Sequence, residues 1–153
     1  MRRVLLTILA IIMMFSMSAC EYQNNVHAFY DKVVEAEAVL DIIATDVCAA
    51  WKDAAYDHNL SEKEINEAIE NAKIENSANI EKLNEYDAEI EELFSAAKVS
   101  FSKSEVKWVM TAYIEYRDSV LNANNSLDLT GYRGVSLKKN TLDNALRNLY
   151  VEL

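Results

Sequence analysis

Apolar residues recur at alternating intervals of three and four positions along the first long segment of the chain. The series is Val26, Phe29, Val33, Ala36, Leu40, Ile43, Val47, Ala50 and Ala54. This spacing is typical of a helix packed in coiled-coil fashion. Tyr30, Val34 and Trp51 widen the stripe, as packing in a globular bundle requires. The pattern predicts a long first helix, which Asn59 would end in a left-handed cap.

Two short motifs mark where the next helices begin. Ser61 and Glu64 have the spacing of a capping box, and so do Ser102 and Glu105. In such a box the serine side chain and the glutamate side chain each accept a hydrogen bond from the other residue's backbone N–H. We therefore expect one helix to begin at Ser61 and another to begin just after a break near residue 100.

The apolar stripes of these two helices identify their buried sides, because each stripe covers a third or more of its helix. The first of them is expected to bury Ile65, Ile69, Ala72, Ile80, Leu83, Tyr86, Ile90, Phe94 and Ala97. The second is expected to bury Val106, Val109, Met110, Tyr113, Ile114, Val120 and Leu121.

Helix-breaking residues are confined to one part of the chain. Proline is absent, and the two glycines are Gly131 and Gly134. Residues 122–126 should end the third helix, and residues 130–134 should form a turn-rich loop. A fourth helix from about Ser136 has the inward residues Leu142, Ala145, Leu146, Leu149 and Leu153. Short links force neighbouring helices to be antiparallel, so we predict an all-α, up-down-up-down helical bundle with a long N-terminal helical hairpin.

The start of the chain has a different character. Arg2 and Arg3 precede an apolar run over residues 4–15 that only Thr7 interrupts. A helix of this length spans about 18 Å, well short of the hydrocarbon core of a bilayer at about 30 Å. The charged start, the apolar run and the small residues before Cys20 instead indicate an export signal that is removed.

The residues that end this signal are Met17-Ser18-Ala19-Cys20. They resemble the signal segment of bacterial lipoproteins, in which an apolar residue, two small residues and a cysteine mark the place of lipid attachment and cleavage. Met17 stands where leucine is usual. The resemblance covers the first 20 residues, and no family is recognised in residues 21–153. It implies a lipid anchor on Cys20, whereas the alternative is an ordinary secretory signal cut after Ala19.

These patterns divide the chain into three parts. We expect a cleaved signal peptide at 1–19, a lipidated N-terminus with a short tether at 20–24, and a single helical-bundle domain at 25–153. A thioether at Cys20 would leave Cys48 without a partner for a disulfide.

Acidic side chains are concentrated in the first half of the chain. The formal net charge is −10, and removal of residues 1–19 takes away Arg2 and Arg3 and so makes it −12. Residues 21–98 carry 6 basic and 19 acidic side chains, whereas residues 99–153 carry 7 and 6. This balance argues against a nucleic-acid partner and favours a cationic partner for the first half, or packing of the two halves on each other.

Helical projection places three polar residues within the apolar stripes, namely Asn76 and Asp87 in the second helix and Arg117 in the third. A buried guanidinium needs a counter-charge. With a turn near residue 100, Arg117 lies within about 4.5 Å of the level of Asp87 along the bundle. We predict a structural ion pair between Arg117 and Asp87 that fixes the register of the two helices.

Three residues are candidates for contact with a partner. Trp108 projects away from the apolar face of the third helix, although a neighbouring helix could cover it. Tyr132 and Arg133 lie between the two glycines, where a loop tip would present them. Packing of Tyr132 onto the end of the bundle is the alternative.

Enzymatic interpretations are disfavoured. His27 and His58 are the only histidines. His27 projects off the apolar face of the first helix and His58 lies at its far end, so the spacing suggests neither a metal set nor a pair of base and nucleophile. Cys48 flanks the core, which is typical of an inert thiol. We therefore expect no catalytic, cofactor or metal site, with weak calcium binding by the glutamates as a minor alternative.

The sequence favours a lipid-anchored, non-enzymatic envelope protein that presents an acidic helical bundle to an unidentified protein partner. Two alternatives remain: an immunity or phage-exclusion type of lipoprotein that neutralises a basic toxin or injection protein, and a structural envelope spacer. The first rests on size, anchor and charge alone.

Overall fold

The chain is all-α, as the sequence predicts, and its helices pack as a bundle. The structure is a computed structural model that describes residues 2–56, 60–97, 103–124 and 129–153, with side chains described over 24–56, 60–97, 104–124 and 133–153. In these ranges the helices are α1 (Arg2–Tyr56), α2 (Glu62–Glu75), α3 (Ser77–Ala97), α4 (Lys103–Leu121) and α5 (Leu129–Glu152).

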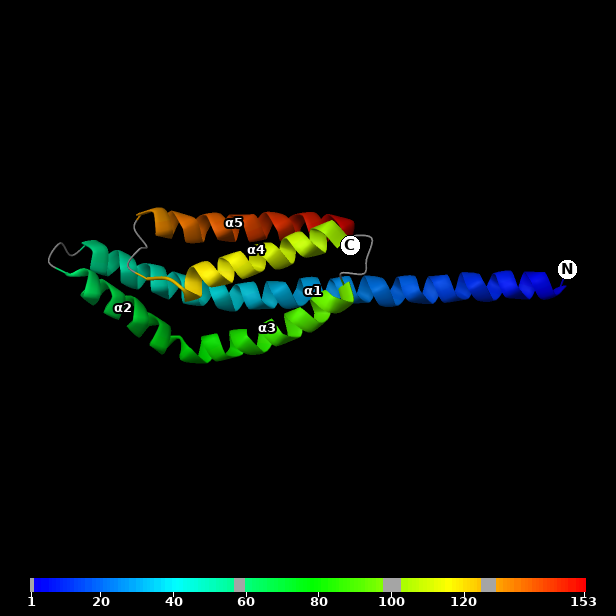
Figure 1. The fold of residues 1–153 in the computed structure, drawn as a ribbon, viewed down its shortest axis with the longest axis horizontal. Helices are drawn as coiled ribbons and strands as arrows, with labels where there is room; N and C mark the ends of the chain where they lie inside the picture. The colour runs from blue at the N-terminus through cyan, green and yellow to red at the C-terminus, as the bar shows by residue number, and fades with distance from the viewer. Residues whose placement is uncertain (1, 57–59, 98–102, 125–128) are drawn as a thin grey trace.

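The helices alternate in direction around the long helix α1 (Figure 1). Helices α2 and α3 together run back along α1, α4 runs forward again, and α5 returns to the end of the bundle from which the N-terminal part of α1 extends. Helix α1 contacts all four other helices, and α4 packs closely on α5. The up-down-up-down order is therefore the one expected from the short links.

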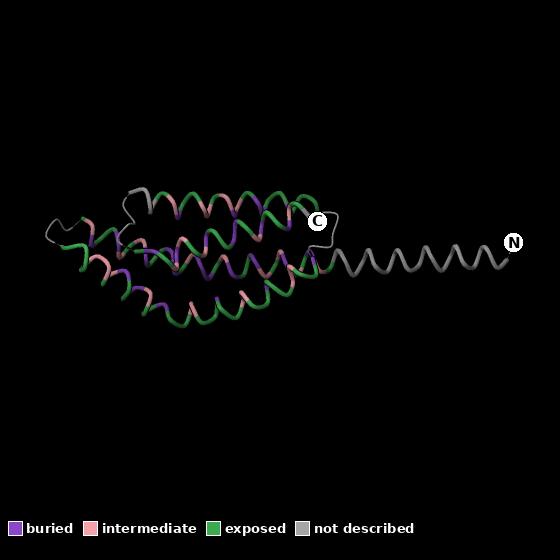
Figure 2. Tube along the Cα trace, in the orientation of Figure 1, coloured by how far each residue is buried: buried purple, intermediate pink, exposed green. Residues whose placement is uncertain are grey.

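The core follows the predicted apolar stripes, and the buried positions lie on the inward sides of the helices (Figure 2). Its largest fully buried side chains are Tyr113, Tyr116, Phe29, Leu40, Ile43, Ile69, Leu83, Ile90, Leu142, Leu149, Val33 and Val47. Two predicted positions of the apolar stripes are wrong: the side chains of Val34 on α1 and Ile114 on α4 are 38% and 40% exposed. The buried stripe of α4 is centred on Tyr113 and Tyr116, so Ile114 falls outside it.

The predicted second helix is two helices, and Asn76 separates them. Asn76 has φ −90° and ψ 13°, outside the usual helical range, and its side chain is buried. Its amide nitrogen donates to the carbonyl of Ala72 (3.0 Å) and to Asp46 Oδ2 on α1 (2.8 Å). The asparagine thus competes with the regular helix ladder and bends the chain, so that α2 and α3 both follow α1 (Figure 1).

The prediction of a turn-rich loop at residues 130–134 is also wrong, because α5 begins at Leu129. No described glycine has a positive φ, and a Cβ added at Gly134 would meet nothing within 4 Å. A helical glycine costs about 1 kcal/mol relative to alanine. Burial of Val135, Leu142, Ala145 and Leu149 along the same helix offsets that cost.

The first capping box is confirmed. Ser61 accepts a hydrogen bond from the backbone N–H of Glu64 (3.4 Å), and Glu64 Oε2 accepts one from the backbone N–H of Ser61 (2.7 Å). The predicted cap at Asn59 and the serine of the second box, Ser102, lie outside the described residues. Helix α4 nevertheless begins at Lys103, with Glu105 in its first turn.

Within the part of the chain whose side chains are described, which begins at Asn24, the structure has no helix that is both long enough and apolar enough to cross a membrane.

Candidate functional site

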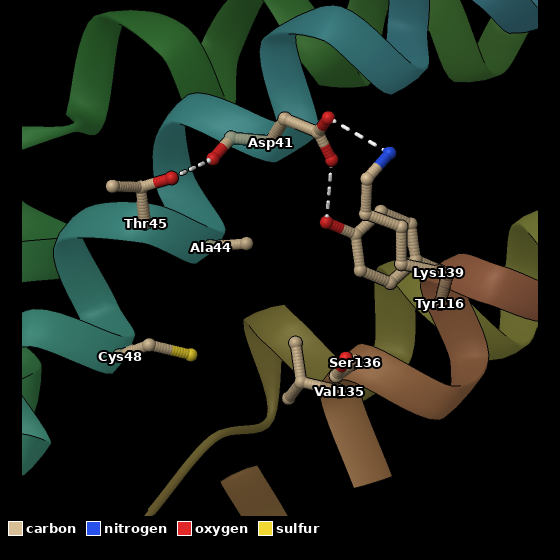
Figure 3. Close-up of a pocket in the computed structure, with 8 residues that line it drawn as sticks. All are labelled: Asp41, Ala44, Thr45, Cys48, Tyr116, Val135, Ser136 and Lys139. Carbon is tan, nitrogen blue, oxygen red and sulfur yellow. Dashed lines mark hydrogen bonds and ion pairs between the residues drawn. The ribbon is translucent and has the colours of Figure 1, made fainter. Parts of the chain in front are cut away.

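A cleft of about 240 Å³ lies between α1, α4 and α5 (Figure 3). It is lined by Asp41, Ala44, Thr45, Cys48, Tyr116, Val135, Ser136 and Lys139. Apolar groups and the Cys48 thiol form one part of its wall, while Asp41, Tyr116 and Lys139 lie together on the other side. The cleft therefore has a charged end and an uncharged end.

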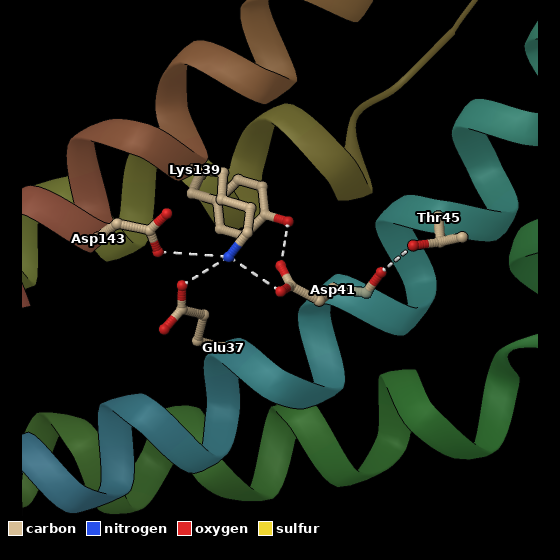
Figure 4. A network of polar contacts seen from close by, with 6 residues as sticks. Glu37, Asp41, Thr45, Lys139 and Asp143 are labelled. Atoms are coloured by element: carbon tan, nitrogen blue, oxygen red, sulfur yellow. Dashed lines mark hydrogen bonds and ion pairs between the residues drawn. The ribbon is translucent and has the colours of Figure 1, made fainter.

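The charged end belongs to a network in which three carboxylates surround one ammonium group (Figure 4). Lys139 Nζ lies 2.9 Å from Glu37 Oε1, 2.9 Å from Asp41 Oδ2 and 3.3 Å from Asp143 Oδ1. The hydroxyl of Tyr116 donates to the other oxygen of Asp41 at 2.7 Å. We call Glu37, Asp41, Lys139 and Asp143 the clasp, because these side chains join α1 to α5.

Helix geometry explains how the clasp residues meet. Glu37 and Asp41 are four residues apart on α1, and Lys139 and Asp143 are four residues apart on α5, so each pair occupies one side of its helix. That side of α1 flanks the coiled-coil seam and includes Tyr30, Ala44 and Cys48. Helix α1 contacts α2 and α3 as well as α4 and α5, which is why this second stripe is covered.

Sequence reasoning missed the clasp. The available signal was that Glu37 and Asp41 continue the stripe of Tyr30, Ala44 and Cys48 beside the seam. A carboxylate within such a stripe has to find a cation or a hydrogen-bond donor on a neighbouring helix. The sequence alone does not identify Lys139 as that cation.

The clasp has unusual electrostatics, because one cation faces three anions. Burial and the neighbouring carboxyl of Asp143 raise the pKa of Glu37 to about 7, against the opposing effect of Lys139. Burial lowers the pKa of Lys139, but its hydrogen bonds to Glu37 and Asp41 outweigh burial and raise that pKa above its ordinary value. Burial and the bond to Asp41 likewise raise the pKa of Tyr116.

These shifts disfavour covalent chemistry in the cleft. Lys139 stays an ammonium ion and is therefore not nucleophilic. Burial raises the pKa of the Cys48 thiol, which keeps it in the less reactive protonated form. Among the side chains that the structure describes, no group of three or more histidine, cysteine or acidic residues is arranged to hold a metal ion.

A second polar cluster lies between α3 and α4 and contains the predicted pair. Arg117 Nε is 2.7 Å from Asp87 Oδ2, although the two atoms do not make a directed hydrogen bond. The hydroxyl of Tyr113 donates to Asp87 Oδ1 at 2.6 Å. The side chains of Arg117 and Asp87 are 29% and 20% exposed, so the guanidinium lies at the edge of the apolar face and not in its middle.

The predicted contact residues do not form one surface. Trp108 is 40% exposed in the second turn of α4, and Arg133 is exposed in the second turn of α5. Because α4 and α5 are antiparallel, the two residues lie toward opposite ends of the bundle (Figure 1). The backbone of Tyr132 is helical and not part of a loop tip, while the side chains of Tyr132 and Cys20 lie outside the described set.

The outer sides of α2 and α3 form the most strongly charged surface among the described residues. We define the acidic face as their exposed glutamates, which are Glu62, Glu64, Glu67, Glu70, Glu75, Glu81, Glu85, Glu89, Glu91 and Glu92. The exposed lysines on these helices are Lys63 and Lys82. Ile74, which is 67% exposed, lies among the carboxylates of α2.

The fold and these sites together define an antiparallel helical bundle with an acidic outer face and a charged clasp between its first and last helices. No protein-family model, curated protein or solved structure matches the chain.

Proposed function

We propose that the chain is a lipid-anchored, non-enzymatic envelope protein that presents the acidic face of α2 and α3 to a basic protein partner. The observation that carries the proposal is the excess of exposed carboxylates over exposed ammonium groups on these two helices. Charge complementarity of this kind steers association and selects partners of opposite sign.

Ile74 supports a protein as the partner. Its side chain is largely exposed among glutamates, and an apolar residue inside a charged rim is the usual composition of a protein contact. A small cation would gain nothing from Ile74, whereas a basic helix or loop could cover it while its lysines and arginines meet the carboxylates.

The position of α2 relative to Cys20 supports presentation away from a membrane. Helix α1 is continuous from Arg2 to Tyr56, and α2 follows its C-terminal end. At about 1.5 Å per residue, the helix between Cys20 and Tyr56 measures about 54 Å. A lipid on Cys20, which the resemblance to lipoprotein signals implies, would therefore hold α2 at the distal end of the bundle.

Site-specific photocrosslinking in cells tests the proposal. A photoreactive benzoylphenylalanine replaces Asn71, which is exposed on α2 one turn before Ile74. The matched control replaces Asn144, an exposed asparagine on α5. We expect ultraviolet light to join an envelope protein to the α2 position and not to the α5 position.

Charge reversal in the chain that carries the photoreactive residue at position 71 tests whether the adduct depends on the acidic face. Glu67→Lys with Glu75→Lys should reduce the adduct severalfold, because both carboxylates belong to the acidic face. Glu152→Lys, at an exposed position on α5, should leave it unchanged. Adducts of equal yield at both probe positions would contradict a binding role for the acidic face. An adduct yield that Glu67→Lys with Glu75→Lys leaves unchanged would also contradict it.

A further inference from the structure

The contact between α1 and α5 encloses an unbalanced set of charges. Lys139 Nζ is within 3.3 Å of carboxylate oxygens from Glu37, Asp41 and Asp143. One ammonium ion neutralises one carboxylate, so two negative charges remain in a confined space when all three acids are ionised. Like charges at such separations disfavour full ionisation.

Glu37 is the member for which this imbalance matters most. Its side chain is 13% exposed, against 38% for Asp41 and 41% for Asp143. Its carboxylate and that of Asp143 lie against the same ammonium nitrogen, at 2.9 Å and 3.3 Å, so their negative charges are close neighbours and protonation of one carboxyl relieves the repulsion. The site therefore holds a proton between α1 and α5 more tightly than an exposed glutamate would.

The groups that face Glu37 come from three helices. Helix α1 contributes Asp41 and Tyr30, α5 contributes Lys139 and Asp143, and α4 contributes Tyr116. Lys139 is the single cation among them. Both tyrosines stay neutral at physiological pH because burial raises the pKa of each.

We propose that the clasp is a proton-operated contact, tight while Glu37 is protonated and weaker once that proton leaves. Loss of the proton adds a third negative charge between the two helices, and Lys139 can balance only one of the three carboxylates. The weaker contact lets α5 separate from α1 more often, which opens the cleft beside it.

Cys48 reports on this opening. It is half-buried and lines the same cleft as Asp41 and Lys139 (Figure 3). A thiol reagent reaches it fully only when α5 moves away from α1. The sequence contains two cysteines, so the full chain carrying Cys20→Ser has Cys48 as its one thiol.

The experiment measures the rate at which 4,4′-dithiodipyridine labels Cys48 at pH 5.5 to 7.5, divided by the rate for the urea-unfolded chain at the same pH. This ratio cancels the ordinary pH dependence of thiol reactivity. As the pH rises, we expect the ratio to increase about tenfold, because opening releases the bound proton. Glu35→Gln, an exposed neighbour on α1, should show the same increase.

Glu37→Gln removes the titrating group and should make the ratio independent of pH at the low, protected level. Lys139→Met provides a second check if that variant folds poorly, because loss of the ammonium group should move the increase to higher pH. A flat ratio in the parent chain would overturn the proposal, and so would a Glu37→Gln variant that follows the parent curve or a Lys139→Met curve that does not shift.

Discussion

At the scale of single residues, α4 carries two tyrosines that each bond to a partly buried aspartate on another helix. Tyr113 and Tyr116 are three positions apart and donate to carboxylates on different helices, Asp87 on α3 and Asp41 on α1. Each carboxylate also meets a cation, Arg117 in one case and Lys139 in the other. A tyrosine hydroxyl with a cation is thus the means by which this core accommodates a partly buried aspartate.

Removal of one partner should reveal this dependence. We expect Asp87→Ala to lower the free energy of unfolding by about 2 kcal/mol, because Arg117 loses a counter-charge and the Tyr113 hydroxyl loses its acceptor. Urea denaturation followed by circular dichroism measures the change. Asp118→Ala, which removes an exposed partner of the same arginine, should cost about 0.5 kcal/mol or less. Equal effects would refute a structural role for the pair.

Glu37 should make stability depend on pH in a direction opposite to that of most acids. Its folded pKa of about 7 exceeds the ordinary value of 4.5, so its contribution to stability is complete below pH 4.5 and is lost as the pH rises through 7. At pH 8 we expect Glu37→Gln to be more stable than the parent by about 1 kcal/mol, a value reduced for partial solvent screening. Denaturation curves at pH 5.5 and pH 8 test this, and a destabilised variant at pH 8 would contradict it.

At the scale of helices, apolar periodicity predicted where the buried faces lie, but it did not predict every boundary. The capping box at Ser61 is a local motif with both partners within one turn, and it is present. The bend at Asn76 depends on Asp46 of another helix, 30 positions away, so no local pattern reveals it. Gly131 and Gly134 predicted a loop because glycine has a low intrinsic propensity for helix. Both lie in α5, where burial of the rest of the helix outweighs that propensity.

The capping box provides a test at this scale. Ser61→Ala should lower the free energy of unfolding by about 1 kcal/mol, since the backbone N–H of Glu64 loses its acceptor at the start of α2. Ser95→Ala, at an exposed position within α3, should be neutral or slightly stabilising. Thermal denaturation distinguishes the two, and no loss of stability in the Ser61 variant would show that this cap is dispensable.

The polar sites differ in how far the sequence reveals them. The pairing of Arg117 with Asp87 follows from two adjacent antiparallel helices and one turn of known position. The clasp pairs Lys139 with Glu37 across 102 positions, between the last and first helices. Their relative register depends on every link between them, which is why sequence reasoning did not bring Glu37 and Lys139 together.

At the scale of the whole molecule, the acidic face and the proposed anchor lie at different places along α1. Glutamates cover the outer sides of α2 and α3 along the bundle, and the part of α1 that contains Cys20 extends from the end at which α3 finishes (Figure 1). The two features suit a protein that is attached at one end and makes contacts at its flank and distal end. The proposed contact with a basic partner would therefore take place at the membrane surface to which the protein is attached.

Mass spectrometry of the chain isolated from the membranes of its native host tests this account most directly. We predict a mature protein that begins at Cys20, with a diacylglyceryl group on the cysteine sulfur and without residues 1–19. Cys20→Ser should abolish the modification and leave the signal segment attached. An unmodified Cys20, or an intact signal segment in the parent chain, would contradict the account.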